Sequence, residues 1–491
     1  MNLKVFAREA VIYAIGNVGM RAASLLLTPL YTYYLTVGDY GLWATIQITI
    51  QMMLILMTVG MREALLRYSK NYENQLGTLI GTTMLTILLG VASVTILSLT
   101  ILVPFFRSVL HRDNVAELIA LTCGAAFAQA MSIHMMSYYR AANQARKFMI
   151  SGIGGALLLF VITFGSLVGL QLGIRGVLWS YMLAYAIIFV VVGGDVLRRT
   201  GISVSLSMMP QLVRFGAPLI LSTAGQFAVV GAGIYLLSYF AGLEVVAIYN
   251  LGYRLAMALS IAVALPFQLA FQPFVYSNLK SPQIRTQTAR LFTYLLLATT
   301  CASFLLLFGS RLLLPLIAPP QYAPAFLVIL FLVPSQALLG VHYFGETLFG
   351  AVQKTEVLAA LSILSVAMCV GLDLALIPVW GWYGAALAST ATALLVNSIE
   401  VAIGIRYFRL AHDMEWRRVG ITVGLFVTLL VALFALRAAS LVVFCGGAIT
   451  VFLVCIMILH FGSFYHDMER TALKSAADQL RMRILPGKFA S

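Results

Sequence analysis

Long apolar segments recur along the whole of this 491-residue chain, separated by short polar loops. An α-helix needs about 20 predominantly apolar residues to cross the roughly 30 Å hydrocarbon core of a membrane. Fourteen segments meet that length, with approximate limits 10–35, 41–60, 77–103, 115–138, 148–170, 174–196, 213–241, 245–275, 290–309, 323–348, 357–378, 383–408, 419–438 and 440–461. Because lipid cannot bond exposed backbone groups, each segment is predicted to be a membrane-spanning α-helix.

The composition excludes a soluble protein. Only 10% of the residues are charged, whereas soluble domains carry about 25%. The five cysteines all fall in apolar segments and form no CxxC pair, so neither a disulfide framework nor a metal site is expected. The sequence contains no nucleophile elbow, P-loop or dinucleotide fingerprint, and we therefore expect no enzymatic activity.

The basic residues predict the orientation of the spans. With the N-terminus inside, 24 of the 31 Lys and Arg residues fall on the inner side, five fall in outer loops, and Arg21 and Arg254 fall within spans. This asymmetry follows the positive-inside rule and favours cytoplasmic N- and C-termini. The net charge of +14 is therefore expected to face anionic lipid, not nucleic acid. The basic tail after residue 462 is expected to lie on the inner membrane surface.

Two halves of the chain are similar at a nearly fixed offset. At an offset of 208, His134 aligns with His342, and two loop segments align, 142–147 with 350–355 and 173–176 with 381–384. At an offset of 206, Arg8 aligns with Arg214 and Gly41 with Ala247. The spans are thus predicted to form two pseudo-symmetric six-helix lobes, followed by two extra helices. The expected limits are 1–205 for the first lobe, 206–412 for the second, 413–462 for spans thirteen and fourteen, and 463–491 for the cytoplasmic tail. Parallel repeats of this kind place substrate near the membrane midplane.

Four passages carry a resemblance to a known family. They read PLYTYYLTVGDYGLWATIQI with GMREALLRY, then YYRAANQARKF, then RFGAPLILSTAGQF through YFAGLEVVAIYNLGYRLA, and finally IPVWGWYGAALAS. In these passages the chain resembles the multidrug/oligosaccharidyl-lipid/polysaccharide exporter superfamily, and within it the flippases for O-antigen and exopolysaccharide repeat units.

The resemblance implies a V-shaped pair of lobes in the bacterial cytoplasmic membrane. It also implies movement of a polyprenyl-pyrophosphate-linked oligosaccharide, carried for example on undecaprenyl pyrophosphate, from the inner to the outer leaflet. A polysaccharide polymerase and glycosyltransferases are the implied partner enzymes, and fourteen-span members use the last two spans as a groove for the lipid tail. Many relatives carry an Asp-Arg pair in span seven, where this chain has Gly231, Ala232 and Gly233. Any ion coupling through that pair is in doubt here.

Two arginines lie deep within predicted spans of different lobes. Arg21 is midway along span one, and Arg254 is about ten residues into span eight. A central arginine costs about 2.5–3.5 kcal/mol in a membrane, and a guanidinium binds phosphate oxygens in bidentate fashion. We expect Arg21 and Arg254 to form a cationic chamber for the pyrophosphate. The alternative is structural pairing with Glu346 or Glu400. Arg62 is either the inner mouth of this chamber or an interfacial topology charge.

Other polar residues within the spans are candidates for ion coupling or gating. Asp373 with Asn397 or Thr390 offers oxygen ligands for a cation or a proton site, and the alternative is a hydrogen-bonded interfacial aspartate. Glu346 and Glu400 are candidates for an inner gate. His134 and His342 suit either proton coupling or hydrogen bonds between helices. No cofactor is expected, and the energy would come from an H⁺ or Na⁺ gradient or from downhill substrate flux.

Two functions other than a flippase compete at this stage. A drug or metabolite exporter of the same superfamily would favour a carboxylate-lined chamber for organic cations, whereas the deepest charges here are arginines. A non-transporting membrane component of a polysaccharide synthesis complex is the third hypothesis. Aromatic residues at 31–34 and 380–383 fall at outer span ends. An interfacial belt explains them, and stacking on sugars that leave an outer gate is the alternative.

Overall fold

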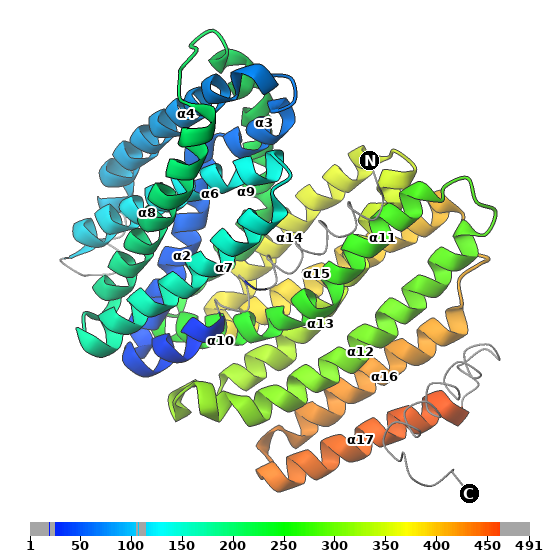
Figure 1. Ribbon diagram of the computed structural model, residues 1–491. Helices are drawn as coiled ribbons and strands as arrows, with labels where there is room; N and C mark the ends of the chain where they lie inside the picture. The colour runs from blue at the N-terminus through cyan, green and yellow to red at the C-terminus, as the bar shows by residue number, and fades with distance from the viewer. Residues whose placement is uncertain (1–18, 20–24, 105–106, 108–113, 462–491) are drawn as a thin grey trace, which may run out of the picture.

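A computed structural model describes residues 19, 25–104, 107 and 114–461, and these residues are almost entirely helical (Figure 1). Residues 25–34 form the first described helix. The remaining long helices are α2 (Val37–Thr58), α3 (Met61–Tyr68), α4 (Leu76–Leu97), α6 (Val115–Ala141), α7 (Ala145–Phe164), α8 (Gly173–Thr200), α9 (Met209–Phe240), α10 (Leu243–Leu259), α11 (Leu265–Ser277), α12 (Ile284–Ile317), α13 (Ala325–Ala351), α14 (Thr355–Trp380), α15 (Trp382–Phe408), α16 (Trp416–Ala435) and α17 (Leu441–Phe461).

Twelve helical stretches within the described residues are long and apolar enough to cross a membrane, and each coincides with one of the fourteen predicted spans. The predicted span 213–241 coincides with α9, a single helix that contains Pro218. The predicted span 10–35 is described only at residue 19 and from residue 25 onward, and the basic tail lies outside the described residues. The chain is therefore an all-helical, multi-pass membrane protein.

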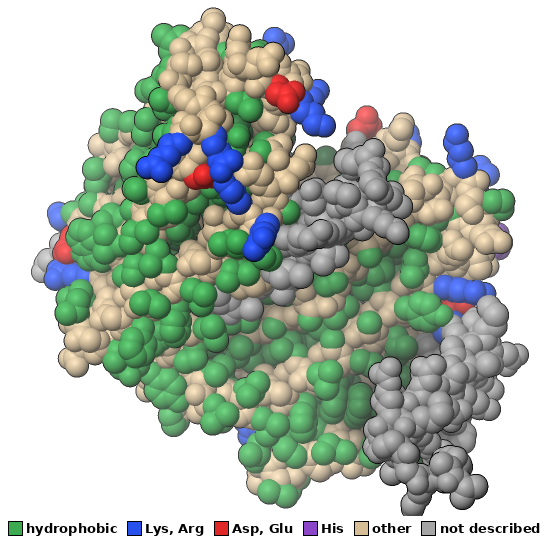
Figure 2. All heavy atoms as spheres, viewed as in Figure 1, with side chains coloured by type: hydrophobic (Ala, Val, Ile, Leu, Met, Phe, Trp, Pro, Cys, Tyr) green, Lys and Arg blue, Asp and Glu red, His purple; other side chains and the backbone are tan. Residues whose placement is uncertain are grey.

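The helices gather in two groups that touch at one end of the molecule and separate toward the other (Figure 1). In the first bundle, α2, α3, α4, α6, α7 and α8 pack on one another. In the second bundle, α10 to α15 pack on one another, and α16 lies against α12 with α17 beside it. Helix α9 belongs to neither bundle alone, because it contacts α2 and α3 as well as α14. Most of the Lys and Arg side chains visible in Figure 2 lie toward the end where the bundles separate.

The bundles meet where α2 crosses α10. A Cβ atom on Gly41 would lie 1.8 Å from the backbone oxygen of Leu243, so only glycine allows these two helices to approach this closely. A second close approach joins the start of α3 to α9, where Gly60 has a φ of 67° and its α-carbon lies against the backbone of Gly216. The Gly41 contact fixes the joint between the bundles, and the Gly60 contact fixes α9 against the first bundle.

One turn occurs in both bundles with the same backbone hydrogen bonds. After α6, Asn143 has a φ of 54° and the amide of Gln144 donates to the carbonyl of Tyr139. After α13, Gln353 has a φ of 57° and the amide of Lys354 donates to the carbonyl of Phe349. The offset between these turns is 210 residues, not the 208 that the sequence alignment predicted.

This offset corrects the predicted equivalence of two histidines. Because α6 and α13 both begin and end 210 residues apart, His134 occupies the register position of Phe344, and His342 that of Ser132. The helix starts of α2 and α10 keep the predicted offset of 206, and Gly173 and Gly381 keep the predicted 208, both with positive φ. The recurring turn and helix lengths support the predicted repeat.

Candidate functional site

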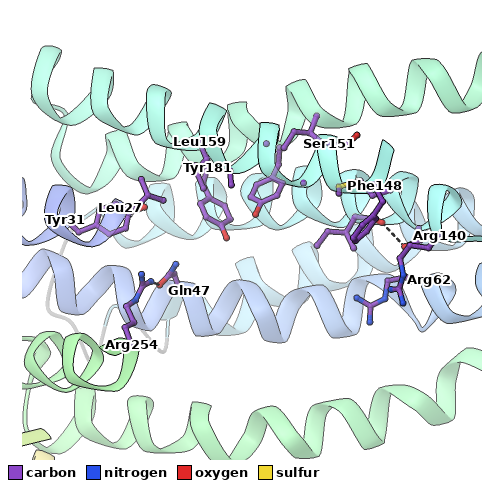
Figure 3. Close-up of a pocket in the computed structure, with 18 residues that line it drawn as sticks. Leu27, Tyr31, Gln47, Arg62, Arg140, Phe148, Ser151, Leu159, Tyr181 and Arg254 are labelled. Carbon is purple, nitrogen blue, oxygen red and sulfur yellow. Dashed lines mark hydrogen bonds between the residues drawn. The ribbon is translucent and has the colours of Figure 1, made fainter. Parts of the chain in front are cut away.

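A cavity of about 320 Å³ opens between the first bundle and α10 (Figure 3). The helix at 25–34 and helices α2, α3, α6, α7 and α8 supply most of its wall, and α10 supplies one residue. The lining residues are Leu27, Tyr31, Gln47, Arg62, Ile133, Met136, Ser137, Arg140, Phe148, Ser151, Gly152, Gly155, Ala156, Leu159, Tyr181, Tyr185, Ile188 and Arg254. This lining set from the described chain contains three arginines and no carboxylate.

Arg254 is the residue that α10 contributes to this cavity. It lies eleven residues after Leu243, three full turns of helix, so it shares the face of α10 that packs on α2 at Gly41. Its guanidinium donates a hydrogen bond to the side-chain oxygen of Gln47 on α2. The contact crosses from one bundle to the other, and the partner is a neutral amide. Among the described residues that line the cavity, no carboxylate offsets the charge of Arg254.

Arg62 and Arg140 line the opposite end of the cavity from Arg254 and Gln47 (Figure 3). Arg62 lies in the first turn of α3. Its Nε donates a hydrogen bond to Glu63 Oε1 at 2.7 Å, and this carboxylate offsets part of the positive charge of Arg62. The guanidinium of Arg140, in the last turn of α6, lies 5.9 Å from the centre of the Phe148 ring. Both side chains are exposed, so this end is the mouth of the cavity.

The structure places two of the three predicted substrate-binding arginines in one cavity, Arg254 and Arg62. The third, Arg21, lies outside the described residues. The sequence did not identify Arg140 as a site residue. A basic residue in a loop between spans is expected whether it only orients the neighbouring spans or also binds a ligand. The alternative of a structural pairing with Glu346 or Glu400 does not hold for Arg254, which bonds Gln47. For Arg21 that alternative lies outside the described residues. Glu346 accepts a hydrogen bond from Gln268 at 3.2 Å, and Glu400 pairs with His342.

The two histidines have different partners. His134 is fully buried, and its Nε2 lies 2.9 Å from the hydroxyl of Thr83 on α4. His342 on α13 lies 2.8 Å through Nδ1 from Glu400 Oε2 on α15, and Glu400 is 1% exposed. A Cβ atom on Gly345 would lie 2.9 Å from the Glu400 carboxylate, so this glycine makes room for the buried acid. Both histidines thus join two helices.

Asp373 is buried in α14 and faces α9. A Cβ atom on Gly233 would lie 3.2 Å from its Oδ2, so the carboxylate points to the 231–233 segment of α9. The Cys369 thiol donates to Oδ2 at 3.8 Å, and Oδ1 has no hydrogen-bond partner among the described residues. Asn397 and Thr390 instead donate to backbone oxygens of α13, at 3.1 Å and 2.7 Å. In the described structure, hydrogen bonds do not join these three predicted ligands.

Comparison with solved structures identifies the fold. A lipid II flippase, MurJ, in an inward closed conformation matches with a TM-score of 0.72 at 12% identity, over 92% of this chain and 99% of that one. An inward-facing multidrug resistance MATE family transporter of the MOP superfamily matches with a TM-score of 0.65 at 16% identity, over 82% of this chain and 98% of that one. An outward-facing transporter of that family gives 0.56 at 16% identity, over 83% and 96%.

Comparison of the sequence with known families identifies the group. No curated protein matches the chain. The family described as "Polysaccharide biosynthesis protein" matches residues 6–278, more than half of the sequence. The chain therefore belongs to the polysaccharide biosynthesis protein family.

Proposed function

We propose that this protein is a flippase that moves a polyprenyl-pyrophosphate-linked oligosaccharide from the inner to the outer leaflet of the bacterial cytoplasmic membrane. The repeat unit of an O-antigen or an exopolysaccharide is the proposed cargo. The observation that carries the proposal is the cavity itself. It contains arginines from both sides of the joint between the bundles and no carboxylate from the described residues. Such a lining suits a diphosphate and disfavours an organic cation.

The arginines act at two depths. Arg62 lies 15 residues after Gln47 along α2 and α3, so helical rise puts roughly 20 Å between them. A pyrophosphate is too short to reach from Arg254, beside Gln47, to Arg62. We infer that Arg62 and Arg140 attract the headgroup at the mouth, where the inner-leaflet lipid arrives. Arg254 then holds the pyrophosphate deep in the cavity, with Arg21 as the proposed second cation.

Alternating access is the proposed mechanism. If the basic end faces the cytoplasm, as the positive-inside rule favours, the bundles are open inward and closed outward. We propose two pseudo-symmetric six-helix lobes that rock about the joint at Gly41, with two extra C-terminal helices, in a fourteen-span protein. The chain matches both an inward-facing and an outward-facing transporter of this fold, with the higher TM-score for the inward-facing one.

Ion coupling is a further part of the proposal. The pair of half-buried His342 with buried Glu400 and the buried Asp373 are the proposed sites at which a proton or Na⁺ would bind. Glu346 lies on the same helix as His342, and Asn397 lies on the same helix as Glu400. The residue of α9 that faces Asp373 is Gly233, which carries no charge. Collapse of the proton gradient and of the sodium gradient in separate export assays distinguishes the two ions.

Complementation tests the proposed function. Deletion of the gene should remove surface glycan and cause its lipid-linked precursor to accumulate, and the wild-type gene should restore both. Arg254→Ala should fail to restore export at normal protein level, because it removes charge-assisted hydrogen bonds worth about 1.5–3 kcal/mol each. Arg285→Ala, at an exposed position outside the cavity, is the matched control and should export normally. Normal export with Arg254→Ala would exclude the proposed role of the cavity, and an unchanged precursor level in the deletion strain would exclude a flippase.

A further inference from the structure

Five aromatic side chains form a cluster at the end where the bundles touch. We call Tyr31, Tyr40, Trp43, Tyr181 and Tyr322 the closed-end cluster. The ring centroid of Tyr31 lies 6.2 Å from that of Tyr40 and 5.8 Å from that of Trp43. The ring centroid of Trp43 lies 5.4 Å from that of Tyr181. The Tyr40 ring lies 5.9 Å from Tyr322, which precedes α13, so the cluster spans both bundles.

The closed-end cluster is continuous with the cavity. Tyr31 and Tyr181 belong to the cluster and also line the cavity on the side of Arg254 (Figure 3). Beside the cluster, the Thr32 hydroxyl donates to the backbone oxygen of Ile317 at 2.6 Å, a second contact that closes this end. A substrate that moved from Arg254 toward this end would therefore meet these rings first.

Two polar atoms of the cluster are buried without a hydrogen bond. Tyr40, Trp43 and Tyr322 are each fully buried. The Tyr322 hydroxyl and the Trp43 indole N–H have no hydrogen-bond partner among the described residues. The Tyr40 hydroxyl instead faces the side chain of Asn250. Buried polar groups are nearly always bonded, and one left without a partner costs free energy.

An interfacial belt does not explain this arrangement. Belt tyrosines and tryptophans keep their polar atoms in contact with water and lipid headgroups, whereas these three side chains contact neither in the closed state. Phenylalanine would fill the same space without the cost. The polar atoms therefore require a different state of the protein, in which the bundles have parted and these atoms can bond.

We propose that the closed-end cluster is a binding surface for sugar residues, exposed only when this end opens. Its ligand is the glycan of the lipid-linked oligosaccharide as it leaves the cavity, so the inference rests on the proposed function. Sugar hydroxyls pair with the hydroxyl, indole and amide donors, and the aliphatic face of a sugar ring packs on the aromatic rings. Unpaired buried groups raise the free energy of the closed state. When a glycan is present to form hydrogen bonds with these groups, opening of this end is therefore favoured.

Isosteric substitutions test this inference. In the double variant Tyr40→Phe with Tyr322→Phe, the rings remain and only the two hydroxyl groups are lost. We expect folded protein with a melting temperature in detergent equal to or above that of the wild type, because the unpaired buried hydroxyl of Tyr322 is removed. We expect binding of the lipid-linked precursor to be unchanged. Export of surface glycan should fall by roughly fivefold for each lost hydrogen bond. Tyr239→Phe, at a 64% exposed position near the same end, should change nothing.

The outcomes separate this inference from the function on which it depends. Wild-type export by the double variant would overturn the inference, and so would a loss of export accompanied by a lower melting temperature, which would indicate a purely structural role. The single variant Tyr322→Phe repeats the test at the second bundle alone. Arg254→Ala, measured in parallel, reports on the proposed function: if that variant exports normally, the proposed function itself fails. Loss of export with Arg254→Ala and normal export with the double variant would remove only the sugar-binding surface.

Discussion

Arg254 and Arg62 differ in what their guanidinium groups contact. Arg254 donates to a neutral amide, whereas Arg62 donates to a carboxylate. The deep arginine therefore presents an uncompensated charge to a ligand, and the mouth arginine presents a partly compensated one. Ion pairs at exposed positions are worth little, so the Arg62–Glu63 pair can give way to a phosphate. This difference suits a cavity that binds a phosphate weakly at its mouth and more tightly at its deep end.

Arg140→Gln tests the role proposed for the mouth. Removal of this charge should lower the rate of capture from the membrane surface. We expect export to fall severalfold when precursor is scarce and to recover when precursor synthesis is raised, since a charge at the mouth acts on association. Measurement of export against precursor level gives this curve. Arg146→Gln, an exposed arginine five residues after Ala141 that does not line the cavity, is the matched control. Equal effects of the two substitutions would contradict a specific role for Arg140.

At this scale, the sequence predicted Arg254 and Arg62 but not Arg140. Arg254 could be identified because an arginine ten residues into an apolar segment has no other ready explanation. Arg140 could not, since positive loop residues are expected in every membrane protein of this kind. The hydrogen bond of Gln47 and the unpaired indole N–H of Trp43 could not be predicted from the sequence for another reason. Both depend on which helices face each other, and contacts between residues far apart in the chain determine that.

Helix α2 is the element on which the arrangement depends. Its first turns meet α10 at Gly41, its middle supplies Gln47, and its last residues pass to α3 through Val59 and Gly60, both with positive φ. A rocking motion of the bundles would have to act across the Gly41 contact. The tight approach there holds the closed end together while leaving the other end free to separate.

Gly41→Ala tests this contact. The added methyl group would lie 1.8 Å from the Leu243 backbone oxygen, so the helices must shift, which we expect to cost about 1–3 kcal/mol of stability. A melting experiment in detergent should show a clear decrease in the temperature of unfolding. Gly38→Ala, three residues earlier in the same helix and with open space around it, should leave that temperature unchanged or slightly raised. Equal stability of the two variants would contradict the close approach.

The positions of most membrane-spanning helices could be predicted from the sequence. The residue-by-residue correspondence between helices of the two halves could not. Twelve predicted spans coincide with apolar helices of the structure, because a long apolar segment has one stable solution in lipid. The predicted equivalence of His134 and His342 was wrong by two residues. The similarity of segments 173–176 and 381–384 at an offset of 208 suggested the same offset for the preceding helices, but α6 and α13 end at the same turn with an offset of 210. The offset between the halves changes from 206 to 210 and back to 208 along the chain. A few similar residues are not enough to locate the insertions and deletions that cause these changes.

The two bundles meet at one end of the molecule and lie farther apart at the other (Figure 1), and most of the basic side chains visible in Figure 2 lie toward that second end. The closed end is held by contacts between distant parts of the chain, among them the bond from Thr32 to Ile317. An exporter that works by alternating access must break these contacts once in each cycle. The two-bundle arrangement and the joint between them make this possible without unfolding either bundle.

A cross-link across the closed end tests alternating access. Thr32→Cys with Ile317→Cys, in a protein whose five native cysteines are replaced by alanine, should form a disulfide under oxidising conditions. We expect that disulfide to stop export and a reducing agent to restore it, because the outer end can no longer open. Each single cysteine variant serves as the control. Full export by the oxidised double variant would show that opening at this end is not needed.

The central claim is that Arg254 binds the pyrophosphate of a lipid-linked oligosaccharide and that the protein carries this lipid across the bilayer. The most direct measurement is the rate at which a polyprenyl-pyrophosphate-linked disaccharide crosses the membrane of vesicles that contain the purified protein. We predict rapid crossing with the wild type and with Arg285→Ala, and crossing close to the protein-free rate with Arg254→Ala. Equal rates for the wild type and Arg254→Ala, or no acceleration by the wild type, would contradict the account.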